Sequence, residues 1–522
     1  MRKLIPSTPI ITILPALALI PVLTDVLIGV HNGGGNILFE FFSASLHPSL
    51  EQTVILSAWK GLQITIATAL LSWVISTFGG MILGVISSNT FWQIFESSQW
   101  KAILIRRILA IPRSIHELIW GLLLLQVFGI GPWIAIIAIC IPYSSLVARV
   151  ISDQIDSLDH GRLIALKHSG ASPFASITTA LLPPMIPVIN SYGSYRLECA
   201  LRGATMLGVF GMGGIGTEMQ LTFQSLEFTE MWTSLWMLGG VMLILEKILS
   251  WWRKAPSSPN RSERQLLISI GVMLTSVLIS LIWLQALDIN LATNFNWHPI
   301  GLPTIADIKN SFHELSWIDL ISNTLLMTLL SAGIAIGIPP LGMILWPTKL
   351  GGAIQSSIWL LLRLIPPPLS ALLLLLCTNP SISVAALALG LQNLGIMGRL
   401  LKEGVSHQSK DLYTAIHSSG SGKRLAWLYG HLSLQSKSYL AYAAYRTDVI
   451  LRETAVVGVV GGVGLGWQLQ ESLSSFDWAQ VALVTTAYST LTLIGETISE
   501  KARQYWLNSA KGPPSLFFQN QF

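Results

Sequence analysis

The residues best suited to chemistry are charged side chains inside two long apolar segments. The first set is Arg196, Glu198 and Arg202, and the second, 250 positions later, is Arg446, Asp448 and Arg452. Charges inside a transmembrane helix are unfavourable unless they are paired or hydrated. In each set the acid and the second arginine are four residues apart, so they can form an ion pair on one helix face.

Two interpretations of these charges stay open from the sequence. In the first, intrahelical ion pairs lock the two helices in place. In the second, Arg196 and Arg446 lack an acid at that spacing, face a central cavity, and offer planar guanidinium groups to an anionic solute. All six residues are therefore candidates for a translocation pathway.

Glycine clusters follow both charged sets. The stretch 211–216 fits the dinucleotide-binding pattern G-x-G-x-x-G, but no strand–turn–helix unit surrounds it, so the nucleotide interpretation fails. A close-packed, bendable helix end that acts as a gate or a turn agrees better with the residue type. The candidate glycines are Gly211, Gly213, Gly214 and Gly216 in the first half and Gly461, Gly464 and Gly466 in the second.

Enzyme chemistry is not indicated by any motif. Residues 419–424 resemble part of the phosphate-loop motif G-x-x-x-x-G-K-[ST]. However, His417 stands at the position of its first glycine and Arg424 at that of its Ser or Thr. The pair His116-Glu117 does not complete a His-Glu-x-x-His zinc pattern, and the three cysteines lie alone in apolar runs. We therefore expect no catalytic residue, metal site or cofactor in this chain. Glu117 stays open as either a packed acid or a cavity-lining one.

Composition decides the class of protein. Of 522 residues, 52% are hydrophobic and only 11% are charged, with a mean hydropathy of +0.60. Apolar runs of about twenty residues recur along the chain, which is the length that a helix needs to cross a bilayer. Backbone groups in lipid must be satisfied within the segment, so we predict an all-α polytopic membrane protein. The basic excess fits cytoplasmic loops, and nucleic-acid binding is not expected.

Hydropathy predicts about twelve transmembrane helices, six in each half. They lie near 8–30, 54–87, 105–128, 131–151, 182–210, 232–251, 267–287, 320–346, 354–378, 381–401, 434–460 and 479–498. The first stretch is too long for a cleaved signal and is interpreted as a retained helix. A basic, Pro/Ser-rich stretch separates the halves. The predicted organisation is a first helical unit at 1–252, a cytoplasmic linker at 253–266, a second unit at 267–505 and a cytoplasmic tail at 506–522.

Positive charges are distributed unevenly between alternate loops. With a cytoplasmic N-terminus, the four predicted outer loops contain a single cation, Lys309. This asymmetry predicts that both termini lie in the cytoplasm.

The two halves are repeats at an interval of 250 residues. Identical pairs include Arg149 with Arg399 and Gln220 with Gln470 (399 − 149 = 250; 470 − 220 = 250). Farther upstream, Arg107 and Pro112 are matched with Arg363 and Pro368 at a longer interval. Six helices per half is an even number, so both repeats insert in the same direction and a pathway is expected between them.

The longest predicted inner loop of each half contains a polar helix, a glycine turn and a short amphipathic segment. This arrangement suits docking to a soluble partner. The loops contain Ala165, Gly170 and Pro183 in the first half and Ala415 and Gly420 in the second, where Ser433 stands at the position of Pro183.

These loops resemble the ATPase-coupling loops of ABC-importer permeases. The segments 182–184, 191–198, 202–205 and 211–216 closely resemble the phosphonate ABC transporter permease, as do 115–120 and 129–132. The chain departs from the family pattern at Ile164, where a glutamate is usual, and at Leu166, where an alanine is usual. It also fuses two units that the family normally carries on separate, dimerising chains.

The resemblance implies the ABC-importer permease fold and the import of phosphonate, phosphite or phosphate across the bacterial cytoplasmic membrane. It further implies a cytoplasmic ABC ATPase dimer that binds ATP and Mg, and a periplasmic or lipid-anchored substrate-binding protein. A homodimer is not required because the units are fused. The alternatives are an ABC permease for another small solute and a twelve-helix secondary transporter, which also has six plus six parallel helices.

Overall fold

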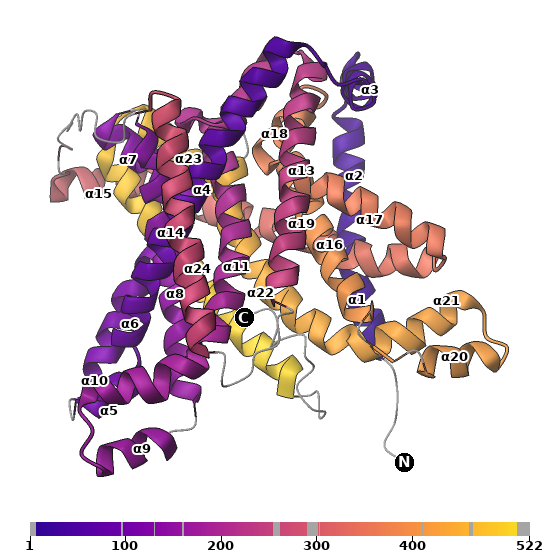
Figure 1. Cartoon of the computed structure of the whole chain (residues 1–522). Coiled ribbons are helices and arrows are strands. Elements are labelled where there is room, and N and C mark those ends of the chain that lie inside the picture. The colour runs from indigo at the N-terminus through magenta and orange to yellow at the C-terminus, as the bar shows by residue number, and fades with distance from the viewer. Residues whose placement is uncertain are drawn as a thin grey trace. The chain divides into compact units, whose positions relative to one another are not determined.

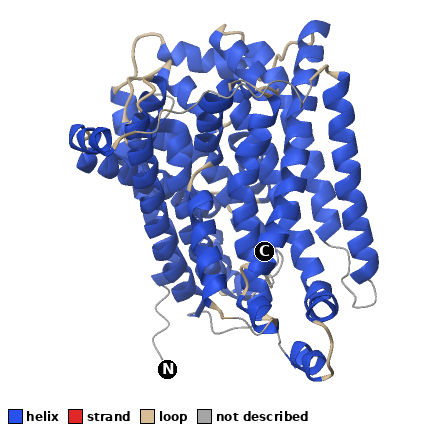
Figure 2. Cartoon of the chain, turned by 90° about the vertical axis from the view of Figure 1, so that its left-hand side faces the viewer, coloured by secondary structure: helices blue, strands red, loops and turns tan. Residues whose placement is uncertain are grey.

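The computed structural model describes residues 7–95, 98–129, 131–158, 161–253, 262–289, 301, 303–406, 408–409, 411–458 and 463–508. Within these ranges the chain is almost entirely helical, and its β structure is limited to one isolated bridge between Val30 and Thr378 (Figure 2). The predicted all-α membrane fold is therefore confirmed.

The described residues form two compact units. The first-half unit comprises residues 47–289, and the second-half unit combines residues 7–46 with 303–508. The helices of the first-half unit are α4 (Gln52–Ile86), α5 (Asn89–Ile94), α6 (Trp100–Ser114), α7 (Glu117–Phe128), α8 (Pro132–Ser157), α9 (Gly161–His168), α10 (Pro173–Ser176), α11 (Leu182–Leu207), α12 (Ile215–Gln224), α13 (Phe228–Arg253) and α14 (Ser262–Ala286) (Figure 1). The helices of the second-half unit are α1 (Ser7–Ile13), α2 (Leu19–Ile28), α3 (Gly34–Ala44), α15 (Ile305–Glu314), α16 (Trp317–Leu345), α17 (Lys349–Leu364), α18 (Pro367–Leu375), α19 (Ile382–Ser406), α20 (Asp411–Ser418), α21 (Lys423–Ala426), α22 (Ser433–Gly458), α23 (Leu465–Ser474) and α24 (Trp478–Asn508).

The N-terminal helices pack in the second-half unit, against α16. A 3-10 turn, Leu14–Ala18, joins α1 to α2 and lies directly over two glycines of α16. A Cβ atom added at Gly333 would lie 2.5 Å from the Cβ of Ala18, and one added at Gly337 would lie 2.0 Å from the backbone nitrogen of Ala16. Only glycine permits such a close approach of two helices.

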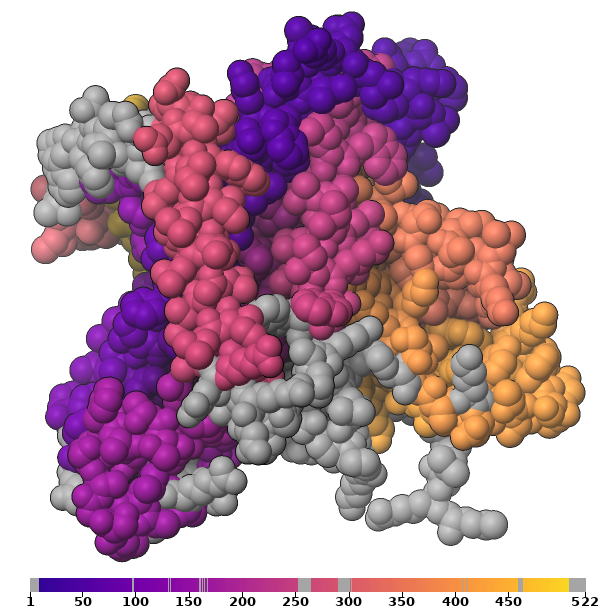
Figure 3. Space-filling model, viewed as in Figure 1, coloured from indigo at the N-terminus to yellow at the C-terminus, as the bar shows by residue number. Residues whose placement is uncertain are grey.

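Helix α14 is the first helix of the second half of the sequence, but it belongs to the first-half unit. There it packs against α4 and α11. Ser269 donates a hydrogen bond to Asn190 Oδ1 of α11 at 2.8 Å, and Leu284 is buried in a cluster with Leu71 of α4. Helix α14 lies at the surface in the view of Figure 3. Many of its leucine and isoleucine side chains are exposed, which suits contact with lipid. The predicted domain boundaries 1–252 and 267–505 follow the sequence repeats. In the structure, each compact unit instead contains the first predicted helix of the opposite half of the sequence.

Nine helices among the described residues are long and apolar enough to cross a membrane, and two bent helix pairs raise that number to eleven. About twelve spans were expected. The difference lies at α22, which has 26 residues but a low hydropathy because it contains Arg446, Asp448, Arg452 and Glu453.

The spans predicted at 105–128 and 354–378 are not single helices. Helices α6 and α7 are bent by 82°, and α17 and α18 by 90°. Extended residues, His116 in the first pair and Pro366 in the second, precede the second helix of each pair. Pro366 is followed by Pro367, whose ring cannot donate a backbone hydrogen bond to a continuing helix.

The bends also correct the repeat alignment upstream. Helix α6 ends at Ser114 and α17 ends at Leu364, so the interval is again 250 (364 − 114 = 250). Arg363 is therefore equivalent to Arg113, and the match with Arg107 at a longer interval is wrong. The first-half unit has the additional helix α5 between α4 and α6, where only residues 346–348 separate α16 from α17.

Candidate functional site

Both predicted coupling loops form a helix, a glycine turn and a second short helix. In the first loop the turn between α9 and α10 contains Gly170 at φ +79°, and in the second the turn between α20 and α21 contains Gly420 at φ +91°. The carbonyl of Ala165 accepts a hydrogen bond from the backbone N–H of Ser169 at 3.1 Å, and Ala415 does the same for Ser419 at 3.1 Å. Glycine is favoured at both turns because other residues are strained at positive φ. We call these two segments, residues 161–176 and 411–426, the elbows.

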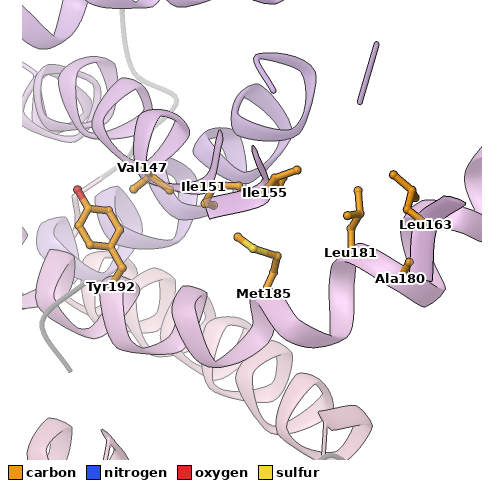
Figure 4. Packing of buried hydrophobic residues seen from close by; sticks show 8 residues of the cluster. All are labelled: Val147, Ile151, Ile155, Leu163, Ala180, Leu181, Met185 and Tyr192. Atoms are coloured by element: carbon orange, nitrogen blue, oxygen red, sulfur yellow. The ribbon is translucent and has the colours of Figure 1, made fainter. Parts of the chain in front are cut away.

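The first elbow is fixed to the membrane helices by a buried apolar cluster. Leu163 of α9 packs in this cluster with Leu181, which precedes α11, and with Ile155 of α8 (Figure 4). Met185 and Tyr192 continue the same cluster along α11. A force applied to α9 is therefore transmitted to α8 and α11 through side-chain packing.

The second elbow is fixed by an aromatic stack. The rings of Tyr413 in α20 and His431 lie 4.7 Å apart with an angle of 18° between them. Gly430 lets α20 approach, because an added Cβ would lie 2.7 Å from the Cα of Tyr413. Pro183 lies in the first turn of α11, and its counterpart Ser433 donates its hydroxyl to the carbonyl of Tyr429. Helices α11 and α22 thus begin at equivalent positions despite this substitution.

The glycine clusters form turns that carry the chain from α11 into α12 and from α22 into α23. Gly214 and Gly464 have φ values of +92° and +101°. In each turn the next backbone N–H donates to a threonine hydroxyl: Ile215 to Thr65 of α4 at 2.8 Å, and Leu465 to Thr324 of α16 at 3.0 Å. Gly214 and Gly464 thus have the positive φ of a turn, and the role of the glycine clusters as a gate stays a prediction.

Further glycines in these clusters allow close packing of the two helices that they join. A Cβ added at Gly216 would lie 2.1 Å from the carbonyl oxygen of Thr205, and one added at Gly466 would lie 3.0 Å from the Cα of Ala455. Gly211 and Gly213 have positive φ, and Gly461 lies outside the described residues.

The charged residues of α11 form the predicted ion pair and an aromatic cage. Arg202 donates to Glu198 at 2.6 Å. Arg196 is only 5% exposed and donates to the Tyr192 hydroxyl. Its guanidinium carbon also lies 5.2, 4.9 and 5.5 Å from the ring centres of Tyr143, Tyr192 and Tyr195. Cation–π contact therefore stabilises this buried charge.

The charged residues of α22 form the equivalent ion pair, and the other arginine has an acidic partner. Arg452 donates to Asp448 at 2.6 Å and lies 3.5 Å from Glu496. Arg446 donates to Glu453 at 3.0 Å and also to the Oδ1 of Asn393. Arg446 has no acid at the four-residue spacing, as the sequence shows, but it pairs with Glu453 seven residues further along α22.

Sequence reasoning missed the bridging residues Tyr143 and Asn393. They are equivalent by the repeat (393 − 143 = 250), and each connects a buried arginine to a carboxylate. The Tyr143 hydroxyl lies 3.2 Å from Glu117 Oε1, and Asn393 Nδ2 donates to Glu453 at 2.7 Å. A polar residue at the same position of both α8 and α19 was the available signal.

Chemistry other than these networks is limited in the described part of the chain. No group of three or more His, Cys, Asp or Glu residues there could hold a metal ion. Glu117 lies 3.5 Å from His116 as well as against Tyr143, so this acid is packed inside the first-half unit.

Comparison with known proteins gives the family. Residues 80–257, which include the first elbow and the charges of α11, match the model of the family described as binding-protein-dependent transport system inner membrane component. The matched part of the chain therefore has the sequence of a permease of this kind. The phosphate-import permease protein PhnE of Mycolicibacterium smegmatis is 23% identical over 395 residues, which cover 72% of this permease and 72% of that protein.

A second relative is the phosphite transport system permease protein PtxC of Stutzerimonas stutzeri, which is 28% identical over 118 residues. That match covers 23% of this permease and 43% of the relative. The alignment with PhnE is longer than one 250-residue repeat, so it includes parts of both halves. The permease is thus a multi-pass membrane component of an ABC importer.

Proposed function

We propose that this permease passes phosphonate, phosphite or phosphate across the cytoplasmic membrane of a bacterium, driven by a separate ABC ATPase. The observation that carries the proposal is the pair of equivalent elbows at α9–α10 and α20–α21, each connected by buried packing to helices of its own unit. The substrate class rests on the relatives, which are named for phosphate import and phosphite transport.

In this mechanism an ATPase dimer contacts both elbows from the cytoplasm, where both termini of the permease also lie. ATP and Mg bind to the partner, and closure of its dimer displaces the elbows. The displacement reaches α11 and α22 through Leu163 in one unit and the Tyr413–His431 stack in the other. An extracytoplasmic binding protein delivers the substrate and sets its specificity.

The glycine turns of the elbows supply the test of coupling. In Gly170→Val the new side chain has open space, because nothing lies within 4 Å of an added Cβ, but the residue is strained at φ +79°. We expect ATP-driven uptake into proteoliposomes to fall at least about tenfold while the amount of membrane-inserted protein stays unchanged, since strain of roughly 1–2 kcal/mol acts only on the turn.

Gly240→Val is the matched control, because its added Cβ is also in open space but its φ is not positive. This control should transport normally. Unchanged uptake in both Gly170→Val and Gly420→Val would reject the coupling role. Uptake without any ATPase subunit, driven by an ion gradient alone, would instead support a secondary transporter.

A further inference from the structure

A cavity in the first-half unit is lined by three arginines and three serines. It lies between the end of α4, helix α6 and helix α8, and its volume is about 220 Å³. The polar lining residues are three arginines, three serines and one aspartate, namely Arg106, Arg113, Arg149, Ser87, Ser145, Ser152 and Asp153. Pockets for drug-sized molecules usually exceed about 300 Å³. This cavity therefore suits a small ion or a lipid headgroup.

Arginine charges exceed acidic charges around the cavity. Arg106 pairs with Asp156, whose carboxylate also accepts hydrogen bonds from the backbone N–H groups of Asn89 and Thr90. Arg149 lies 3.8 Å from Asp153, whose side chain is 61% exposed. The lining of the cavity thus contains three arginines and one aspartate.

Hydrogen bonds hold Arg106 at the cavity wall. Its Nε donates to the carbonyl of Ser87 at 2.8 Å, and its Nη2 donates to the Ser152 hydroxyl at 2.6 Å. That hydroxyl in turn donates to the same Ser87 carbonyl at 3.1 Å. A guanidinium group positioned in this way loses little conformational freedom when an anion binds.

Helix α6 has Arg106 and Arg113 on a different face from its exposed stripe of apolar residues. Arg106 and Arg113 are seven residues apart, two turns along one face. Leu104, Ile108 and Ile111 form another stripe and are 46%, 57% and 55% exposed. An exposed apolar stripe beside basic residues is typical of a helix at the surface of a membrane, where phosphate groups of lipids are located.

The equivalent place in the second-half unit is filled by an aromatic side chain. Trp359 replaces Leu109 (359 − 109 = 250), is 5% exposed, and packs on Gly398, the counterpart of Ala148. A Cβ added at Gly398 would lie 2.4 Å from the Trp359 ring. Ser356 takes the place of Arg106. The permease repeat therefore does not require the cavity or its full set of arginines, which points to a binding role.

We propose that this cavity binds a phosphate group, carried either by an anionic phospholipid headgroup or by a free phosphate ion. Arginine forks match the oxygens of a phosphate in pairs, and the three lining serines donate their hydroxyls to backbone carbonyls of Gly84, Ile141 and Ser87. The site is separate from the charged sets of α11 and α22, and the proposal does not depend on which solute the permease transports.

The test uses the purified full-length permease and two probes. Equilibrium dialysis measures binding of inorganic phosphate, and phosphorus analysis after delipidation measures retained phosphatidylglycerol against phosphatidylcholine. Arg149→Gln should weaken binding of one probe at least tenfold, whereas its repeat counterpart, Arg399→Gln, should not. The probe that is lost identifies the source of the phosphate group.

A second variant distinguishes loss of the site from misfolding of Arg149→Gln. Leu109→Trp with Ala148→Gly recreates the packing of Trp359 on Gly398 and keeps all three arginines. It should abolish binding of the same probe. Undiminished binding of both probes in this filled variant, or an equal loss in Arg399→Gln, would overturn the proposal.

Discussion

Arg196 and Arg446 stand at equivalent positions of α11 and α22, yet different groups surround them. Arg196 lies among the rings of three tyrosines, and Arg446 contacts Asn393 and Glu453. Each unit compensates its buried arginine locally, once mainly through aromatic faces and once through a carboxylate. Burial of the charge is therefore the shared feature, and the chemistry of compensation is not.

The carboxylate beside each bridging residue comes from a different helix. In the first-half unit it is Glu117 of α7, and a Cβ added at Gly203 of α11 would lie 3.2 Å from its Oε1. In the second-half unit the position equivalent to Gly203 is Glu453, and the position equivalent to Glu117 is Pro367 (453 − 203 = 250; 367 − 117 = 250). A carboxylate thus lies beside the bridging residue in both units, although it comes from α7 in one unit and from α22 in the other.

The largest expected effect follows removal of the arginine that has an acidic partner. Arg446→Ala leaves Glu453 buried without its cation, which should lower stability by about 3–5 kcal/mol. Arg196→Ala removes the cation–π contacts and the hydrogen bond to the Tyr192 hydroxyl but leaves Glu117 hydrogen-bonded to Tyr143, so the loss should be smaller, about 2–3 kcal/mol. Thermal unfolding of both purified variants in detergent checks this order. Equal losses would show that the two networks do not differ energetically.

Moving the acid tests whether the two networks are equivalent. Glu117→Ala leaves the Tyr143 hydroxyl without its partner and should destabilise by about 1–3 kcal/mol. Adding Gly203→Glu should restore at least half of the lost unfolding temperature, because it copies the arrangement of Glu453. Gly193→Glu in the same helix is the control and should restore nothing. Failure of the Gly203→Glu rescue would contradict the shared location of the carboxylate.

A smaller effect is expected when only the bridging hydroxyl is removed. Tyr143→Phe keeps the ring against Arg196 but loses the contact with Glu117, so stability should fall by about 0.5–1.5 kcal/mol. Asn393→Ala should be worse, since Asn393 bonds to both Arg446 and Glu453. Thermal unfolding of the two variants measures the difference. A larger loss in Tyr143→Phe than in Asn393→Ala would contradict the assigned roles of the two bridging residues.

The smallest effect belongs to the more exposed ion pair. The side chains of Glu198 and Arg202 are each 20% exposed, so Glu198→Gln should change stability by about 1 kcal/mol or less, and by still less at high salt. Asp448, 5% exposed and paired with Arg452, should be more sensitive to the same change. Salt-dependent unfolding of Glu198→Gln and Asp448→Asn would reveal whether exposure controls the difference.

The sequence by itself determined the features that depend on local spacing. An acid and an arginine four residues apart meet on one helix face, so both intrahelical ion pairs could be predicted. The glycines at 170 and 420 could likewise be placed at turns, because backbone freedom belongs to the residue itself. The 250-residue repeat and the membrane class follow from residue identity and hydropathy alone.

Only the tertiary structure decided the contacts between helices distant in sequence. The exchange of the first helices depends on Gly333 and Gly337 meeting the turn at Ala16, and no periodicity within either segment encodes that partner. The same holds for Asn393 between Arg446 and Glu453 and for the cavity beside Leu109. Packing of helix against helix selects these contacts, because close fit requires the shapes of both surfaces at once.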